Sequence, residues 1–361
     1  MSRLFVANLN FERQIAGDRR NLPLDVHRRS AELAACWLPL CQPGDAVWCS
    51  SSVPKTFWIG MAELGLSLVR GVDDAAAVPP NLALVPWGWT EELRRFGQQV
   101  RANVAAPPDG AVVRANSRRF ACELETRWDV GLPGARAVTS HAELGETLRN
   151  VGPHARWVIK SEFSSAARQR IVGTGPVPDQ NSAGWINKRL AAGEWLAYEP
   201  WVERVREAGL QWTVPPTGPP VLDGIAELLT GPAGNYLGSA FGLSVAERAV
   251  WQPAIEVQQR AVDAIQQTGY FGPVGIDAML YRGADGVERL RPLQDINARW
   301  TMGRLALEWQ RILPAGVWRH GTAAEFAERS LLKPTLIRTS PDIVGGQPAQ
   351  TATWLEPQGV Y

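Results

Sequence analysis

The strongest constraint on the fold lies between residues 269 and 303, where two β-prone runs flank a turn. The first run, residues 274–281, is apolar except for one carboxylate, Asp277. The intervening Gly-Ala-Asp-Gly, residues 283–286, has turn chemistry, because glycine tolerates positive φ and aspartate caps turns. The stretch therefore predicts a β-hairpin that carries a carboxylate inside its first strand.

The return strand of this hairpin is predicted to end in a polar row, Asp295-x-Asn297-x-Arg299. Residues two apart on a strand point to one face, and the hairpin can bring Asp277 near that face. Two carboxylates and an amide oxygen suit Mg²⁺, and Mg²⁺ in proteins usually accompanies phosphate. The hairpin thus predicts a magnesium site for a phosphate compound. The alternative for each residue is a solvated side chain on a half-exposed strand.

The bulk composition is that of a globular protein without charge bias. The 361 residues are enough for two or three structural units. A content of 45% hydrophobic and 20% charged residues is ordinary for a globular protein. Lys and Arg number 37 against 36 Asp and Glu, which argues against binding nucleic acid or a membrane surface through bulk charge. Apolar runs are too short for a membrane-spanning helix, and the N-terminus is too polar for a signal peptide. We therefore expect a cytoplasmic protein, and four cysteines without CxxC spacing agree.

Two architectures follow one another along the chain. Before a Pro-Pro-Asp-Gly boundary at residues 107–110, strand and helix patterns alternate, which is typical of a small parallel α/β unit. There we expect strands over 3–9, 46–49, 67–70 and 81–87, helices over 25–40, 54–64 and 90–104, and a loop over 10–23. Beyond the boundary we expect strands over 156–160, 195–203, 210–214 and 221–228, and helices over 116–128, 140–150, 181–192, 244–268, 301–313 and 323–331.

Two further segments have the chemistry of a nucleotide site. Lys160 ends an apolar strand and precedes a loop of small residues, and an ammonium with loop N–H groups can hold polyphosphate. The segment Glu199-Pro-Trp-Val-Glu203 is extended, so its backbone can read an adenine edge and a carboxylate can hold ribose hydroxyls. For each segment alone, the alternative is an ordinary solvated strand end or edge.

Motifs of several other enzyme classes are absent. No G-x-x-x-x-G-K-[ST] occurs, so the chain is not a P-loop enzyme, and Gly173-Thr-Gly175 lacks the third glycine of the dinucleotide fingerprint. No G-x-S-x-G or H-E-x-x-H occurs either, which argues against a serine hydrolase or a zinc protease.

Taken in order, these features resemble the ATP-grasp superfamily of carboxylate–amine ligases over roughly residues 1–315. The most specific segments are residues 270–277 and 295–303. The resemblance implies an α/β (α+β) fold with an N-terminal Rossmann-like α/β unit, a small lid and a C-terminal antiparallel sheet with helices. The implied division is an N-terminal domain over 1–110, an ATP-grasp domain over 111–330 with its lid at roughly 133–205, and a mixed C-terminal tail over 331–361.

The resemblance also implies roles for individual residues. Asp277, Asp295 and Asn297 would bind Mg²⁺, while Arg299 and Lys160 would act on the transferred phosphoryl group. ATP would contact Lys160, Arg118, Ser164, Ser165, Arg168, Glu199, Trp201, Val202 and Glu207. Either Glu203 or Glu207 would hold the ribose, and Glu207 is preferred because it directly precedes the next predicted strand.

Three departures from the family pattern concern rate and nucleotide affinity rather than fold. Asp295 stands where the family usually has glutamate, and its shorter arm should still reach a metal. The loop over 164–167 lacks the usual glycines, and Arg118 or Arg119 replaces a usual lysine.

The resemblance implies an ATP- and Mg²⁺-dependent ligase that joins a small-molecule carboxylate to an amine through an acyl phosphate. One alternative is a nucleotide-binding ATP-grasp protein with weak or lost catalysis, and another is a dinucleotide-dependent dehydrogenase. Residues that could line the acceptor pocket are Asn8, Asn10, Glu12, Arg13, Trp300 and His320. The oligomeric state stays open, with a homodimer as one expectation because dimers are common in the family.

Overall fold

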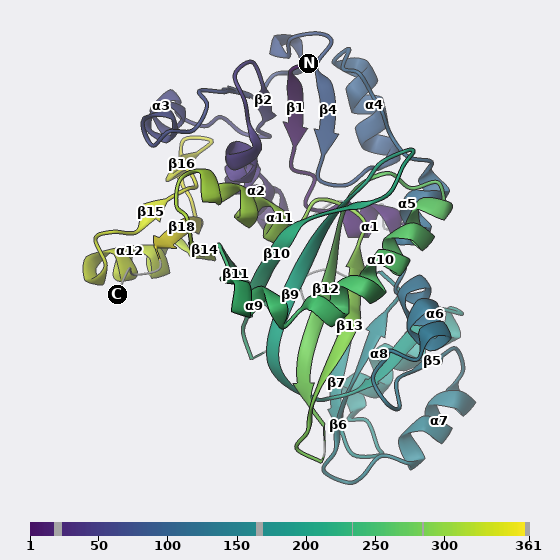
Figure 1. Ribbon diagram of the computed structural model, residues 1–361. Coiled ribbons are helices and arrows are strands. Elements are labelled where there is room, and N and C mark those ends of the chain that lie inside the picture. The colour runs from purple at the N-terminus through teal and green to yellow at the C-terminus, as the bar shows by residue number, and fades with distance from the viewer. Residues whose placement is uncertain (18–23, 164–168, 233, 284, 358–361) are drawn as a thin grey trace.

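The computed structural model describes residues 1–17, 24–163, 169–232, 234–283 and 285–357. Within these ranges the chain forms an N-terminal sheet, a small antiparallel sheet and a large antiparallel sheet, with helices against them (Figure 1). The N-terminal sheet and the small sheet lie at opposite ends of the large sheet (Figure 1). The candidate site residues predicted from the sequence are therefore carried by elements that are far apart in the chain.

The N-terminal sheet is parallel, as the alternating pattern predicted. Its order is β3-β2-β1-β4, formed by β1 (Arg3–Val6), β2 (Ala46–Trp48), β3 (Arg70–Val72) and β4 (Ala83–Pro86). Its helices include α3 (Lys55–Glu63) and α4 (Glu91–Gln99). The Thr90 hydroxyl caps α4 by accepting from the Leu93 N–H, as a threonine before two glutamates predicts.

Two details of this unit differ from the sequence prediction. The expected loop over 10–23 contains a short helix, α1 (Phe11–Ile15), which the fully buried Phe11 anchors to the core. The expected helix over 25–40 divides into α2 (Leu24–Glu32) and a 3₁₀ segment, η1 (Ala34–Leu40). Pro39 lies inside η1, and a residue without an N–H cannot continue an α-helical ladder.

The small sheet has the order β5-β8-β6-β7. Its strands are β5 (Arg136–Val138), β6 (Arg156–Ser161), β7 (Arg170–Thr174) and β8 (Leu196–Pro200). Helices α7 (His141–Arg149) and α8 (Gln180–Ala191) cover it through a core that includes Trp157, Ile159 and Ile186. The antiparallel pairing of β6 with β8 sets Lys160 beside the segment that ends at Pro200.

The large sheet has eight strands among the described residues, in the order β13-β12-β9-β10-β11-β14-β18-β15. They are β9 (Glu203–Val214), β10 (Val221–Thr230), β11 (Tyr236–Phe241), β12 (Gly272–Arg282), β13 (Glu288–Asn297), β14 (Gly316–Thr322), β15 (Ile337–Arg338) and β18 (Thr351–Pro357). The predicted helix over 244–268 is α9 (Val245–Ala249) and α10 (Gln252–Gln267), and it breaks near Pro253 as expected.

The remaining elements join these layers. Helices α5 (Asp109–Ala115) and α6 (Arg118–Trp128) follow the N-terminal unit, and α6 packs on β13. Helix α11 (Met302–Glu308) and the 3₁₀ segment η3 (Trp309–Arg311) follow the hairpin. The short elements are η2 (Ala75–Ala77), α12 (Ala323–Leu332), β16 (Ile343–Val344) and β17 (Gln347–Pro348).

The segment expected as a C-terminal tail contributes to the sheet instead. Strand β18 pairs along its whole length with β14, and its residues Trp354 and Leu355 are buried. Of the short strands that precede it, β17 contains Pro348 and is separated from β16 by Gly345 and Gly346, which conceals their β pattern in the sequence. Within the described ranges, none of the helices combines the length and apolar content needed to cross a bilayer.

Candidate active site

The predicted hairpin is formed by β12 and β13, and its register places two acids opposite each other. Asp277 pairs with Asp295, and Gly275 pairs with Asn297, in an antiparallel ladder. Asn297 Nδ2 donates to Asp277 Oδ2 at 3.3 Å. Asp277, Asp295 and Asn297 therefore lie together, as the alternation in the sequence predicted.

Arg299 lies beyond the strand that was expected to contain it. Strand β13 ends at Asn297, because the backbone turns there and the Arg299 N–H donates to the Asn297 carbonyl at 2.8 Å. The guanidinium nevertheless returns to the site, where Nη2 donates to Asn297 Oδ1 at 3.0 Å. The same nitrogen lies 2.6 Å from Oε1 of Glu12, on helix α1. Arg299 therefore joins the hairpin to the N-terminal unit.

The charge around Asp277 favours a bound cation. Burial, reinforced by the negative charges of Asp295 and Glu207, raises the pKa of Asp277 to about 8. In the part of the chain that the structure describes, no group of three or more His, Cys, Asp or Glu side chains is arranged to hold a metal ion. The local donors are two carboxylates and one amide oxygen, and Mg²⁺ commonly takes one or two carboxylates together with substrate phosphates. The residues therefore fit Mg²⁺ that arrives with a nucleotide.

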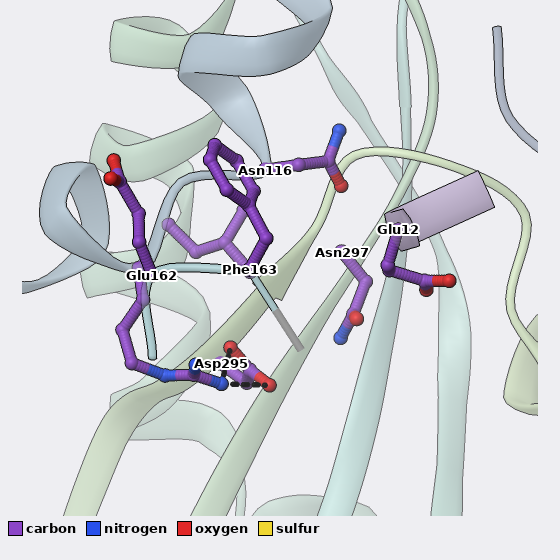
Figure 2. A pocket seen from close by; sticks show the side chains of 8 residues that line it. Glu12, Asn116, Glu162, Phe163, Asp295 and Asn297 are labelled. Carbon is purple, nitrogen blue, oxygen red and sulfur yellow. Dashed lines mark hydrogen bonds and ion pairs between the residues drawn. The ribbon is translucent and has the colours of Figure 1, made fainter. Parts of the chain in front are cut away.

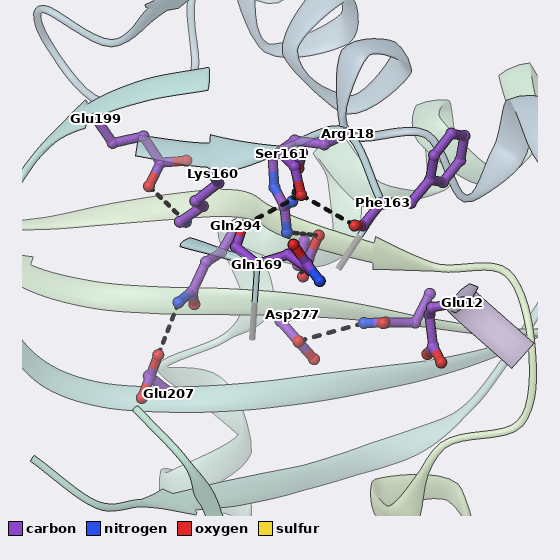
Figure 3. Close-up of polar contacts among 12 residues, drawn as sticks. Glu12, Arg118, Lys160, Ser161, Phe163, Gln169, Glu199, Glu207, Asp277 and Gln294 are labelled. Carbon is purple, nitrogen blue, oxygen red and sulfur yellow. Dashed lines mark hydrogen bonds and ion pairs between the residues drawn. The ribbon is translucent and has the colours of Figure 1, made fainter. Parts of the chain in front are cut away.

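Arg118, rather than Arg119, faces this site. The Arg118 side chain, which lies beside Ser161 in Figure 3, is 8% exposed and donates from Nη1 to the Ser161 carbonyl at 2.6 Å. It also reaches both Asp295 oxygens, at 3.3 and 3.4 Å. Arg119 is exposed and pairs with Glu123 on its own helix. Arg118 thus links the small sheet to the hairpin. The other expected phosphate contacts, Ser164, Ser165 and Arg168, lie outside the described residues.

Lys160 and Glu199 form an ion pair on the small sheet, in which Glu199 is buried and Lys160 is partly buried. Lys160 Nζ lies 2.6 Å from Glu199 Oε2 (Figure 3). Burial lowers the pKa of Lys160, although the charge of Glu199 opposes this shift. Burial alone raises the pKa of Glu199, but Arg291 and Lys160 together hold it well below its usual range. Glu199 is therefore ionised at neutral pH, and it holds the Lys160 amine beside it.

Sequence reasoning missed two residues of this cluster. Arg291 Nη2 donates to Glu199 Oε1 at 3.1 Å, and Arg291 also donates to both oxygens of Glu125 at 2.6 and 2.9 Å. An arginine flanked by Leu290 on one side and by Pro292 and Leu293 on the other was the available signal, because a charge among apolar residues is buried only with a partner.

An apolar cluster beside the end of β8 offers a surface for an adenine ring. Val202 packs there against Leu132, which precedes β5, and against Met279 and Tyr281 of β12. Trp201 was expected to offer backbone contacts, but its N–H already donates to the Arg156 carbonyl at 2.9 Å. This bond exists because the chain continues the edge of β6 past Pro200. Val202 is thus the better placed of the two predicted contacts.

Of the two ribose candidates, Glu207 faces the site. Its carboxylate is 7% exposed and accepts from Gln294 Nε2 at 2.7 Å and from Thr230 Oγ1 at 2.5 Å (Figure 3). Glu203 is exposed and pairs with Arg282. This difference supports the choice of Glu207.

A small pocket opens at the hairpin (Figure 2). It is lined by Glu12, Asn116, Arg118, Glu162, Phe163, Asp295, Ile296 and Asn297. Glu12 is the one acceptor candidate that lines this pocket. Asn8 instead binds the Gly88 carbonyl at 2.8 Å, while Trp300 packs on Trp37 and His320 packs between Tyr236 and Trp318.

Solved structures with the same overall architecture are ATP-grasp enzymes. N5-carboxyaminoimidazole synthetase from Staphylococcus aureus, complexed with ADP, is 10% identical, with a TM-score of 0.56 over 92% of this chain and 91% of that one. N5-carboxyaminoimidazole ribonucleotide synthetase from Thermus thermophilus is 16% identical, with a TM-score of 0.53 over 100% and 94%. The biotin carboxylase domain dimer of the Hydrogenobacter thermophilus 2-oxoglutarate carboxylase, with MgADP, ADP and bicarbonate, is 10% identical, with a TM-score of 0.56 over 99% and 86%. No protein-family model matches the sequence, and no curated protein matches it.

The chain has the ATP-grasp fold, and the fold prediction is confirmed. In this fold the candidate residues lie where the small sheet approaches the hairpin of the large sheet, and Arg118 touches both.

Proposed function

We propose that this protein is an ATP- and Mg²⁺-dependent ligase that joins a small-molecule carboxylate to an amine. One observation carries the proposal: Arg118 links β6 of the small sheet to Asp295 of the hairpin, beside the Lys160–Glu199 pair. A lysine for phosphates and a pair of acids for Mg²⁺ thus lie close to one another. ADP in the Staphylococcus aureus structure and MgADP in the Hydrogenobacter thermophilus structure support this choice of nucleotide and metal.

In the proposed mechanism the side chains position and neutralise charge. Lys160 and Arg118 hold the phosphates, and Arg299 stabilises the negative charge that develops as a substrate carboxylate attacks the γ-phosphorus. Mg²⁺, when bound by Asp277, Asp295 and Asn297, neutralises further phosphate charge. ADP leaves, and the amine nitrogen then attacks the acyl carbon and expels phosphate. The small sheet would act as a lid that keeps water from the acyl phosphate.

The acid and amine are proposed to be small molecules, because the pocket at the hairpin is small and polar. The domain division is also proposed as 1–110 and 111–330, with β18 added to the large sheet from the last segment. A cytoplasmic location and a homodimer complete the proposal. The four free cysteines, three of them buried, support a reducing compartment.

Trapping with hydroxylamine tests the reaction directly. Hydroxylamine converts an acyl phosphate into a stable hydroxamate, so purified protein with MgATP and a panel of carboxylic acids should form ADP and a hydroxamate in equal amounts. ADP without hydroxamate across an extensive panel would contradict the acyl-phosphate step.

A second candidate is a protein that binds nucleotide but has lost catalysis. The contact between Glu12 and Arg299 favours it, because the arginine proposed to assist phosphoryl transfer already holds a protein carboxylate. Calorimetric binding of ATP with no ADP formed from any acid would support this candidate over the ligase.

A further inference from the structure

A chain of four alternating charges crosses the interior from the small sheet to helix α6. Lys160 Nζ contacts Glu199 Oε2 at 2.6 Å, and Glu199 Oε1 accepts from Arg291 Nη2 at 3.1 Å. Arg291 donates from Nε and Nη2 to the two oxygens of Glu125, at 2.6 and 2.9 Å. The four residues come from β6, β8, β13 and α6, so the chain of charges joins elements that are distant in the sequence.

Stability alone is a weak reason for these charges to be buried. Arg291 is 2% exposed, Glu199 is 4% exposed and Glu125 is 5% exposed. Removing charges from water is costly, and a buried ion pair often contributes no more to stability than well-packed apolar side chains of similar volume. A role in orienting the nucleotide site accounts for them better.

The geometry shows how the orientation works. Arg291 is a planar fork, and its two bonds to Glu125 fix the plane of the guanidinium. The fixed fork holds one Glu199 oxygen and leaves the other for Lys160. Helix α6 begins at Arg118, which contacts Asp295, and it carries Glu125 two turns later. Helix α6 therefore helps to position both the phosphate lysine, Lys160, and the hairpin.

We propose that Glu125 and Arg291 are positioning residues for ATP binding, which hold Glu199 so that Lys160 is presented to a phosphate. When Lys160 moves its bond from Glu199 to the phosphate, Arg291 keeps the buried Glu199 carboxylate paired. Without Arg291, the same exchange would leave a buried carboxylate without a cation, which is unfavourable. This inference rests on the proposed function, since it requires ATP to bind at this site.

The charged groups around Glu199 predict that MgATP binding depends on pH when Arg291 is removed. Lys160 and Arg291 are the cations that contact Glu199 directly. Arg118 acts on Lys160 from α6, and the nearby Cys122 thiol is neutral because burial raises its pKa to about 12. If Arg291 is removed, burial raises the pKa of Glu199, so protonation of Glu199 moves up towards neutral pH.

The first test compares Arg291→Met with Arg289→Met by calorimetric titration of MgATP into the full chain. Arg289 is the matched control, because it lies two residues earlier on β13, is exposed and pairs with Asp285. We expect Arg291→Met to weaken MgATP binding by about tenfold or more, as the loss of a residue that supports a metal ligand typically does at metal sites. Arg289→Met should leave MgATP binding unchanged. Between pH 7.5 and pH 5.5, binding by Arg291→Met should weaken more steeply than binding by the unmodified chain or by Arg289→Met, because protonation of Glu199 adds to the loss of Mg²⁺ affinity that all three share.

The second test separates positioning from support of the fold. In Glu125→Leu with Arg291→Met, both members of that ion pair become apolar, so the variant should recover the part of the thermal stability that Arg291→Met loses through the unpaired Glu125 carboxylate. Positioning predicts that MgATP affinity in this double variant stays low and depends on pH more steeply than in the unmodified chain. A purely structural role predicts that affinity recovers with stability, and that result would overturn the inference. If Arg291→Met does not fold, the double variant alone decides the question.

MgATP binding by the unmodified chain distinguishes a failure of the proposed function from a failure of the positioning role. An unmodified chain that binds no MgATP rejects the nucleotide site itself, together with everything built on it. An unmodified chain that binds MgATP, with an equally tight double variant, rejects only the positioning role.

Discussion

The two ends of the candidate site differ in how completely their charges are paired. At the nucleotide end, Glu199 has a cation on each oxygen, and Arg291 is itself held by Glu125. At the reaction end, Asp277 and Asp295 face each other across the hairpin, and the pKa of Asp277 is raised to about 8 by burial and by nearby acids. The nucleotide end is therefore organised in advance, while at the reaction end a divalent cation would stabilise the ionised form of Asp277 beside Asp295.

This comparison predicts different kinetic effects at the two ends. Changes at the reaction end should lower the rate of ADP formation, since those groups act on the charge of the transition state. Changes at the nucleotide end should weaken ATP binding more than they slow turnover.

The largest effect is expected from Asp295→Ala combined with Asn297→Ala. Loss of the proposed Mg²⁺ ligands should reduce ADP formation by about 10³-fold, because the phosphate charge is no longer neutralised. Steady-state assays of ADP release measure the effect. Asp285→Ala, at the exposed end of the same hairpin, is the control and should retain full turnover. Unchanged turnover in the double variant would remove the hairpin from the mechanism.

Arg299→Met should reduce kcat by about 10²-fold while the dissociation constant of ATP changes little. Its guanidinium lies beside Asn297 and Glu12 at the reaction end, away from the Lys160–Glu199 pair. Turnover assays with calorimetric ATP titrations separate the two quantities. A variant that loses ATP affinity but keeps kcat would place Arg299 at the wrong end of the site.

The binding of Mg²⁺ should strengthen as the pH rises. Since the pKa of Asp277 is raised to about 8 by burial, Asp295 and Glu207, Asp277 is protonated at neutral pH and must lose that proton to bind the cation. Affinity should then rise by up to about tenfold per pH unit below pH 8 and level off above it. Titrations of the ADP complex with Mg²⁺ from pH 6 to pH 9 measure this slope. Asp277→Asn should abolish the slope, and a steep slope in that variant would assign the proton elsewhere.

The smallest effect is expected at the ribose. Glu207→Gln should weaken ATP binding by roughly fivefold, because a hydrogen bond to a charged group has a net contribution of about 1.5–3 kcal/mol and the amide oxygen of glutamine keeps part of it. Glu203→Gln should have no effect, because Glu203 is exposed and pairs with Arg282. The reverse result would exchange the two assignments.

The sequence predicted the local parts of the site better than their contacts. The hairpin was predictable because a period of two and a glycine turn are local signals, and they placed Asp277 opposite Asp295. The contact between Arg291 and Glu125 was not predictable, because it joins residues 166 positions apart, and the apolar neighbours of Arg291 indicate burial but not its partner. Arg299 was placed on the strand by extrapolating the alternation past the residue where the backbone turns.

The ends of the chain show the same limit. Helix α1 is five residues long, too short for a periodic pattern, so the expected loop hid the element that brings Glu12 to the site. Strand β18 was missed because its partner, β14, lies earlier in the chain, and pairing with a distant strand leaves no local signature. In both cases tertiary contacts decided the structure.

The most direct test of the proposed nucleotide site is a calorimetric titration of ATP into the full chain, with and without Mg²⁺. It is made for the unmodified protein and for Lys160→Met. The account predicts one site per chain, binding that strengthens when Mg²⁺ is present, and a loss of affinity of about tenfold or more in Lys160→Met. ATP that binds equally well to Lys160→Met, or that does not bind to the unmodified chain at all, would contradict it.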